Sequence, residues 1–201
     1  MRQLSETRAA AERAMRKLEL TAARIGDAEG FEILLGTLTS HLGLILYSLA
    51  QQNQLEPASD ILVRLTILAY NDMGTVLPPP DSPLWECTDP PRVQLVPQSG
   101  QPGIALIPLQ RDGSEAASLS EADVSDSGDA VVRAFNEMQP TVTAAIREES
   151  LAAVIGGLGS ILAFALQRLV ADNRTQAVNG ILKTLECIIE SASPSGTPVA
   201  L

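Results

Sequence analysis

Residues that build catalytic and metal sites are scarce in this chain, whose 201 residues include one histidine and two cysteines. The histidine, His41, has no second histidine, no cysteine pair and no Glu-x-x-His spacing around it, so the usual zinc and di-iron ligand sets are missing. Cys87 and Cys187 lie far apart in the sequence, which is typical of unpaired thiols in a reducing compartment. We therefore expect no metal, no cofactor and no disulfide.

Aromatic residues are also few, at 3% of the chain, although 45% of the residues are hydrophobic. The apolar content comes from alanine, leucine, isoleucine and valine, a mixture that favours helices over sheets. A chain of this length buries roughly 70% of its unfolded surface and so forms a core without a metal or a disulfide. We predict an all-α protein.

Positive charge is limited, since 14 lysine and arginine residues oppose 24 acidic residues and leave a net charge of −10. Nucleic acids and anionic membranes bind lysine and arginine in exchange for counterions, so neither is an expected partner. The N-terminal twenty residues contain no apolar stretch of signal-peptide length, and we expect a cytoplasmic protein. The excess of arginine over lysine, together with the many alanines, suggests a bacterial source.

The chain repeats itself at an offset of 120 residues. Positions 36–70 align with positions 156–190 without a gap, and ten of these thirty-five pairs are identical. Six identical pairs are leucines, so the informative matches are Gly36/Gly156, Ser40/Ser160, Asn53/Asn173 and Ile61/Ile181. A duplicated unit of this kind predicts architecture and says little about chemistry.

Apolar periodicity predicts three helices in each copy. In the first copy they cover residues 5–25, 31–52 and 56 onward, with Pro57 in a first turn that tolerates proline. In the second copy they cover residues 130–147, 150–171 and 176–191. We expect Pro140 to kink or restart its helix near Gln139.

These helices predict two pseudo-repeated three-helix units, residues 1–72 and 130–192, packed together as a six-helix bundle. The connector, residues 73–129, is proline-rich at one end and acidic and serine-rich at the other, as linkers are. Its two short apolar runs, within residues 92–110, either pair as a β-hairpin or remain extended. The tail, residues 193–201, is expected to be disordered.

Small residues recur at positions i, i+4 and i+7 in the second helix of each copy: Gly36, Ser40, Gly43, Gly156, Ser160 and Ala163. A stripe of small side chains lets another helix approach closely, so we predict that these two helices cross each other at the centre of the bundle. The alternative is that both stripes lie beneath other helices. The uncharged run from Leu151 to Leu166 is shorter than the ~20 residues that span a bilayer, which favours a buried helix.

His41 is the default residue for any acid–base chemistry. It lies on an apolar helical face between Leu38, Leu42 and Ile45, and its repeat partner is Ile161. These neighbours favour a core histidine over a ligand-binding or catalytic one, and we assign no catalytic residue.

The duplication, the long connector and the lack of a convergent polar site favour a non-enzymatic adaptor or scaffold that binds a protein partner, with homodimer formation as a further possibility. Two alternatives stay open. One is a small-molecule-binding bundle or enzyme with a cavity near His41, and the other is a membrane-associated helical protein. No motif in the chain resembles a known family closely enough to name one.

Overall fold

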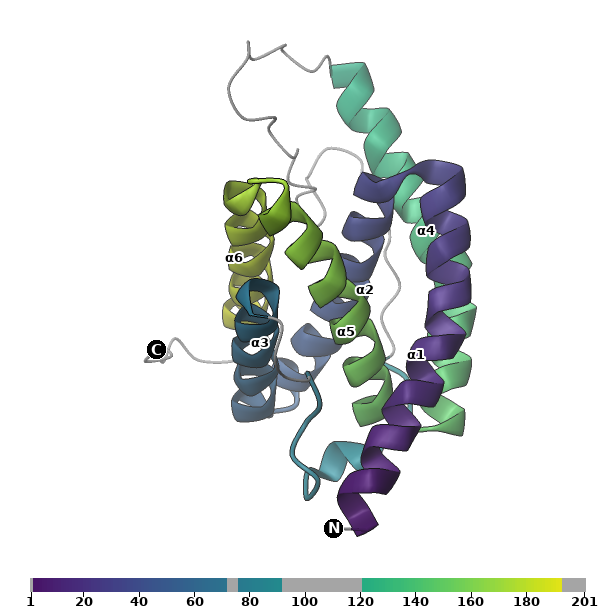
Figure 1. Cartoon of the computed structure of the whole chain (residues 1–201), viewed down its shortest axis with the longest axis vertical. Helices are drawn as coiled ribbons and strands as arrows, with labels where there is room; N and C mark the ends of the chain where they lie inside the picture. The colour runs from purple at the N-terminus through teal and green to yellow at the C-terminus, as the bar shows by residue number, and fades with distance from the viewer. Residues whose placement is uncertain (1, 72–75, 92–120, 193–201) are drawn as a thin grey trace.

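The computed structural model describes residues 2–71, 76–91 and 121–192, and within these ranges the protein is all-helical, without a β-strand (Figure 1). The first half forms α1 (Arg2–Glu29), α2 (Phe31–Gln51) and α3 (Leu55–Tyr70). A 3₁₀ turn, η1 (Pro83–Trp85), lies in the connector. The second half forms α4 (Glu121–Glu148), α5 (Leu151–Ala171) and α6 (Thr175–Ala192). The prediction of an all-α helical bundle is confirmed.

The six helices are arranged in three layers of two (Figure 1). Helices α2 and α5 form the middle layer, with α1 and α4 side by side on one flank and α3 and α6 on the other. The middle helices are the most apolar, and α5 is buried without interruption from its first residue to Gly159. The outer helices are amphipathic and turn one apolar face inward, which is the pattern expected of surface helices.

Helices from the two halves of the chain interleave instead of forming separate units. Helix α1 packs mainly on α5 and α4, α2 packs on α6 and α4, and α3 packs on α5. Buried residues of all six helices belong to one continuous hydrophobic cluster. The predicted units, residues 1–72 and 130–192, therefore share a single core.

The helix boundaries agree with the sequence prediction at α2 and α5 and differ most at α4. Helix α4 begins at Glu121, nine residues before the predicted start at residue 130, so the acidic end of the expected connector is helical. Helix α4 also runs through Pro140 without restarting, because Met138 and Val142 on either side are held in the core. The predicted hairpin and the tail lie outside the described residues.

The short turns that join the helices have matching geometries in the two halves. Asn53 and Asn173 both adopt the left-handed conformation, with φ of 59° and 60°, and end α2 and α5 respectively. In each turn the next amide hydrogen bonds back to a helix carbonyl, from Gln54 to Leu49 O at 2.9 Å and from Arg174 to Leu169 O at 2.8 Å. Asparagine tolerates this backbone region better than most residues, which explains its use at both helix ends.

Several contacts also repeat at the offset of 120 residues. Arg13 pairs with Glu149 at 2.8 Å, and the equivalent residues Arg133 and Glu29 lie 3.5 Å apart. The hydroxyls of Thr21 and Thr141, which are themselves equivalent positions, lie 3.2 Å from each other between α1 and α4.

The described part of the connector after α3, residues 76–91, crosses one end of the bundle, and we call it the strap. Val76 packs against Gly159 and Leu77 against Gly156, both on α5. The backbone carbonyl of Cys87 then accepts a hydrogen bond of 2.7 Å from the amide of Leu151, at the start of α5. The last strap residues, Pro90 and Pro91, reach the opposite side of the bundle beside α2 and α4.

Candidate functional site

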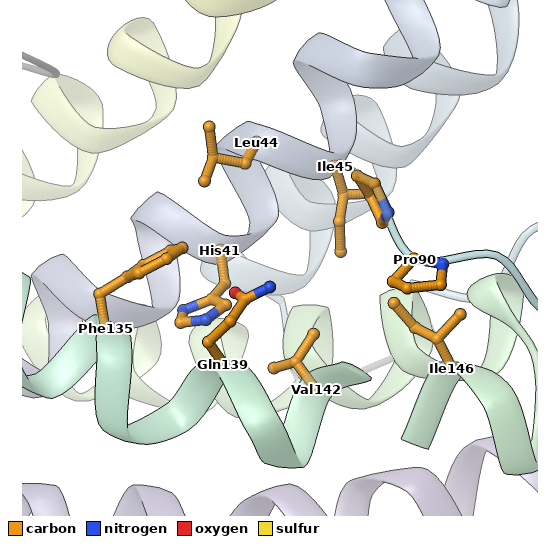
Figure 2. A pocket seen from close by; sticks show the side chains of 9 residues that line it. His41, Leu44, Ile45, Pro90, Phe135, Gln139, Val142 and Ile146 are labelled. Carbon is orange, nitrogen blue, oxygen red and sulfur yellow. The ribbon is translucent and has the colours of Figure 1, made fainter. Parts of the chain in front are cut away.

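A cavity beside the histidine lies between α2, α4 and the end of the strap (Figure 2). Helix α2 contributes the histidine, α4 contributes an aromatic ring and an amide, and the strap contributes two prolines. The lining residues are His41, Leu44, Ile45, Pro90, Pro91, Phe135, Gln139, Val142 and Ile146. Apart from His41, none of them is ionisable.

His41 is held in place by contacts on several sides. Its side chain is 3% exposed, and its ring stacks on Phe135 with ring centroids 3.9 Å apart and planes at 18°. Its Nδ1 atom lies 3.0 Å from the carbonyl oxygen of Thr37, one turn earlier on α2. Because a carbonyl only accepts, Nδ1 must carry the proton and donate it.

The other ring nitrogen of His41 is left without a hydrogen bond. Nε2 is fully buried and has no partner of acceptable geometry, although the Gln139 side chain lies beside the ring (Figure 2). With Nδ1 protonated, Nε2 presents a lone pair. A buried polar atom without a hydrogen-bond partner costs free energy. Nε2 is therefore a candidate contact for a ligand or for a functional role.

Burial decides the charge state of His41. Desolvation lowers its pKa from the usual 6.5 to about 4, against the opposing effects of the Thr37 carbonyl and of Gln139. The imidazole is therefore neutral at physiological pH and is a weak base. A general base is most effective when its pKa lies near the working pH, which does not describe this residue.

The cavity beside His41 measures about 20 Å³. A cavity needs roughly 10–15 Å³ to hold a water molecule, whereas ligand pockets usually span about 300–1,000 Å³. The cavity thus accommodates a water-sized molecule beside the His41 side chain and is too small for an organic substrate.

The small-residue stripe predicted for the crossing of α2 and α5 has its closest neighbours on other elements. A Cβ atom at Gly43 would lie 2.9 Å from Ile188 on α6, and one at Gly156 would lie 2.3 Å from Leu77 of the strap and 3.3 Å from Ala11 on α1. Ser160 donates to the carbonyl oxygen of Gly156 at 2.7 Å.

The other members of the stripe are mostly buried as well. Ser40 and Ala163 are buried and Gly36 is half-buried, and α2 and α5 also contact each other. The stripe therefore serves several close approaches, of which those at Gly43 and Gly156 are made to α6, α1 and the strap.

Gly157 and Gly159 make close contacts that the sequence analysis did not assign. A Cβ at Gly157 would lie 3.0 Å from the backbone nitrogen of Met15, so α1 and α5 are nearly in backbone contact there. A Cβ at Gly159 would lie 2.5 Å from Val76 of the strap. The sequence signal was the run of three glycines on α5, which marks a crowded helix surface.

An ion-pair cluster joins the end of α4 to α1. Glu149 accepts from Arg13 at 2.8 Å and from Lys17 at 3.4 Å, and Lys17 also pairs with Glu148. The hydrogen bond from Arg13 is the largest factor that lowers the pKa of Glu149. Across residues 2–71, 76–91 and 121–192, no group of three or more histidine, cysteine, aspartate or glutamate side chains could hold a metal ion. The cluster accordingly links helices.

The described surface exposes five large hydrophobic side chains. Three of them, Val63, Ile67 and Tyr70, follow one another at i, i+4 and i+7 on the outer face of α3, with exposures of 45%, 49% and 41%. We call these three the α3 stripe. Leu20 on α1 and Phe164 on α5 are exposed singly, at 78% and 69%.

Two described helices, α2 and α5, are long and apolar enough to cross a membrane by length and composition. In both, 67% of the most apolar window is buried inside the protein, as in the core helices of soluble proteins. This feature alone is weak support for a membrane role.

Comparisons with known proteins found no relative of this chain. No protein-family model matches it, and neither a curated protein sequence nor a solved structure matches it. Its function has to be argued from its own residues.

Proposed function

We propose that this protein is a non-enzymatic interaction module whose protein partner binds the α3 stripe. The observation that carries the proposal is the alignment of Val63, Ile67 and Tyr70 along the solvent side of one helix. Residues spaced in this way present a continuous apolar ridge, which is the kind of surface used when one amphipathic helix docks against another.

The equivalent face of α6 shows that the bundle does not require apolar residues there. At the offset of 120 residues, Val63, Ile67 and Tyr70 correspond to Lys183, Cys187 and Glu190. All three are exposed on α6. A polar or charged surface therefore suits this position of the fold, and the apolar character of α3 calls for another explanation. Binding of a partner supplies one.

We also propose that the two halves arose by duplication of a three-helix unit. The matching Asn53 and Asn173 turns and the contact between Thr21 and Thr141 support this origin. A half-length ancestor would have formed a twofold homodimer, and fusion of its two copies leaves each half free to specialise its outer face. The polar face of α6 and the apolar face of α3 would then be products of such specialisation.

The alternative of a small-molecule site at His41 receives less support. The cavity holds only a water-sized molecule, and the depressed pKa of His41 makes it a poor proton acceptor. An enzyme of this design would need the strap to open before a substrate could enter. Membrane association is supported only by the composition of α2 and α5, which form the centre of the core.

The test compares variants of α3 with a matched variant of α6. Tagged wild-type chain, a Val63→Glu/Ile67→Glu double variant and Cys187→Glu are purified from the native host without detergent and weighed by native mass spectrometry. Both faces are exposed, so circular dichroism should show all three chains folded. We expect a stoichiometric partner with the wild type and with Cys187→Glu, and its loss from the double variant.

Two results would contradict the proposal. One is a partner that the double variant retains, because binding would then not involve the α3 stripe. The other is wild-type protein that stays monomeric and bare in every preparation, or that is recovered only from the membrane fraction. If the wild type forms a homodimer and the double variant is monomeric, the partner is a second copy of the chain.

A further inference from the structure

The α3 stripe lies on the flank of the bundle that α3 shares with α6 (Figure 1). These two helices together contain four acidic and two basic residues, which gives them a net charge of −2. Both basic side chains are paired within their own helices, Arg64 with Asp60 at 2.8 Å and Lys183 with Glu186 at 2.6 Å. The cations of α3 and α6 are therefore already engaged inside the protein.

Two carboxylates of this flank, Glu56 and Glu190, are exposed, and neither forms an ion pair within residues 2–71, 76–91 and 121–192. Glu56 precedes Val63 by seven residues, so it lies two turns away on the same face of α3 as the stripe. Glu190 is the α6 residue equivalent to Tyr70. A partner that lies along α3 and reaches α6 therefore meets unpaired negative charge beside the apolar contacts.

The aromatic member of the stripe is held in position before any partner binds. The hydroxyl of Tyr70 donates a hydrogen bond of 2.5 Å to the side-chain oxygen of Asn179 on α6, while the residue remains 41% exposed. A side chain that is already ordered loses little conformational freedom on binding, and tyrosine is enriched among the residues that dominate interface energies. Tyr70 is therefore the expected anchor of the stripe.

We propose that the α3 stripe binds a basic amphipathic helix of a partner protein. Its apolar side chains pack on Val63, Ile67 and Tyr70, and lysine or arginine at the edge of its apolar face complements Glu56 and Glu190. The net charge of −10 disfavours a second copy of the chain and an anionic membrane as the occupant. This inference rests on the proposed function, because it specifies the partner of the same surface.

The probe is a fluorescein-labelled helical peptide of about 14 residues, built from leucine and lysine with leucine on one face and lysine on the other. A second peptide has glutamate in place of every lysine. Fluorescence anisotropy at low salt measures the binding of both peptides to the full-length chain. The control variant Glu19→Gln/Asp27→Asn removes two exposed carboxylates from α1. The test variants are Val63→Ser/Ile67→Ser, Tyr70→Ala and Glu56→Gln/Glu190→Gln.

We expect the lysine peptide to bind saturably and the glutamate peptide to bind at least about 10-fold more weakly. Tyr70→Ala and the serine double variant should each weaken binding of the lysine peptide by roughly 10-fold or more, because they remove the anchor and the apolar contacts. Glu56→Gln/Glu190→Gln should weaken it about 5-fold, whereas the α1 control, with the same change in net charge, should alter it by less than about 2-fold. All substituted positions are exposed, and circular dichroism checks that the variants remain folded.

Four results would overturn the inference. The first is equally tight binding of both peptides that the serine double variant abolishes, which would leave the proposed function standing without a preference for basic partners. The second is binding of the lysine peptide that this variant retains, because general attraction to an acidic protein would explain it. The third is no saturable binding of the lysine peptide up to about 1 mM. The fourth is self-association that the serine double variant abolishes, since a second copy would then be the occupant. A native partner that the Val63→Glu/Ile67→Glu variant retains would instead contradict the proposed function itself.

Discussion

Acidification should destabilise this protein through His41. The pKa of the buried ring is lowered to about 4 by desolvation, while the same side chain in the unfolded chain titrates near 6.5. Between these two pH values, His41 is largely protonated in the unfolded chain and largely neutral in the folded protein. The contribution of neutral His41 is therefore fully present above pH 6.5 and is lost as the pH falls toward 4.

The size of the effect follows from the two pKa values. Linkage gives a loss in the free energy of unfolding of about 1.4 kcal/mol at pH 5.5 and about 2.5 kcal/mol at pH 4.5, relative to pH 8. No other ionisable side chain lines the cavity, so His41 acts there alone. The hydrogen bond from Arg13 lowers the pKa of Glu149, so the stability that this carboxylate contributes is lost at the acid end, as the pH falls below the ordinary carboxyl pKa.

A comparison with His41→Ile isolates the histidine from these carboxylates. Isoleucine is the residue at the equivalent position 161; it is apolar and cannot titrate. Urea unfolding followed by circular dichroism at pH 8, 5.5 and 4.5 gives the free energy of unfolding of both chains. Relative to pH 8, the free energy of unfolding of the wild type should fall below that of the variant by a further amount of about 1.4 kcal/mol at pH 5.5 and about 2.5 kcal/mol at pH 4.5.

Because His41 is the only histidine, an imidazole NMR titration of tag-free protein reads its pKa directly. A titration midpoint near 6.5 would refute the reasoning. Free energies of unfolding that fall equally with pH in the wild type and the variant would also refute it, because the His41 ring would then be solvated in the folded state.

The backbone geometry supports three further predictions, each checked by thermal or urea unfolding. Gly157→Ala should lower stability by about 1–3 kcal/mol, because its Cβ would press on the Met15 backbone. Gly43→Ala should be near neutral, because its Cβ meets only the ends of the Ile188 and Leu185 side chains; equal stabilities of the two variants would contradict this. Asn53→Ala and Asn173→Ala should each cost roughly 1–2 kcal/mol, and the corresponding glycine variants should cost almost nothing. Equal costs for the alanine and glycine variants would contradict a left-handed backbone at these positions. Ser150→Ala should cost about 1 kcal/mol, since the serine hydroxyl accepts from the amide of Ala153 at 3.1 Å, and an unchanged midpoint would exclude that cap.

The helices of the core could be predicted from the sequence because their ends carry distinct chemical marks. Ser150 caps α5, and Asn173 ends it in a left-handed turn, so an apolar run with clear limits gave the correct boundaries. The start of α4 could not be found in this way. Its first nine residues are mostly polar, and periodicity detects a helix only where one face is apolar.

The neighbours of each helix were harder to predict than the helices. The spacing of Gly43 and Gly156 indicated a crowded face but could not say which element crowds it, because that depends on how distant segments are arranged. The burial of His41 agreed with its apolar neighbours in sequence. Its unpaired Nε2 and its cavity depend on Phe135 and Gln139, which come from a helix more than ninety residues away.

The interleaving of the two halves has a consequence for how the chain is made. When the ribosome has finished α3, neither α4 nor α5 exists, yet these helices are the main neighbours of α1. At about 5–20 residues per second, the roughly one hundred residues from Tyr70 to Ala171 take on the order of 5–20 s to synthesise. Throughout that interval α1, α2 and α3 can pack only on one another, and the surfaces of α1 and α2 that α4, α5 and α6 cover in the finished protein stay exposed. The core is therefore completed only after synthesis of the second half, and a stalled ribosome would release a fragment that lacks half of the core helices.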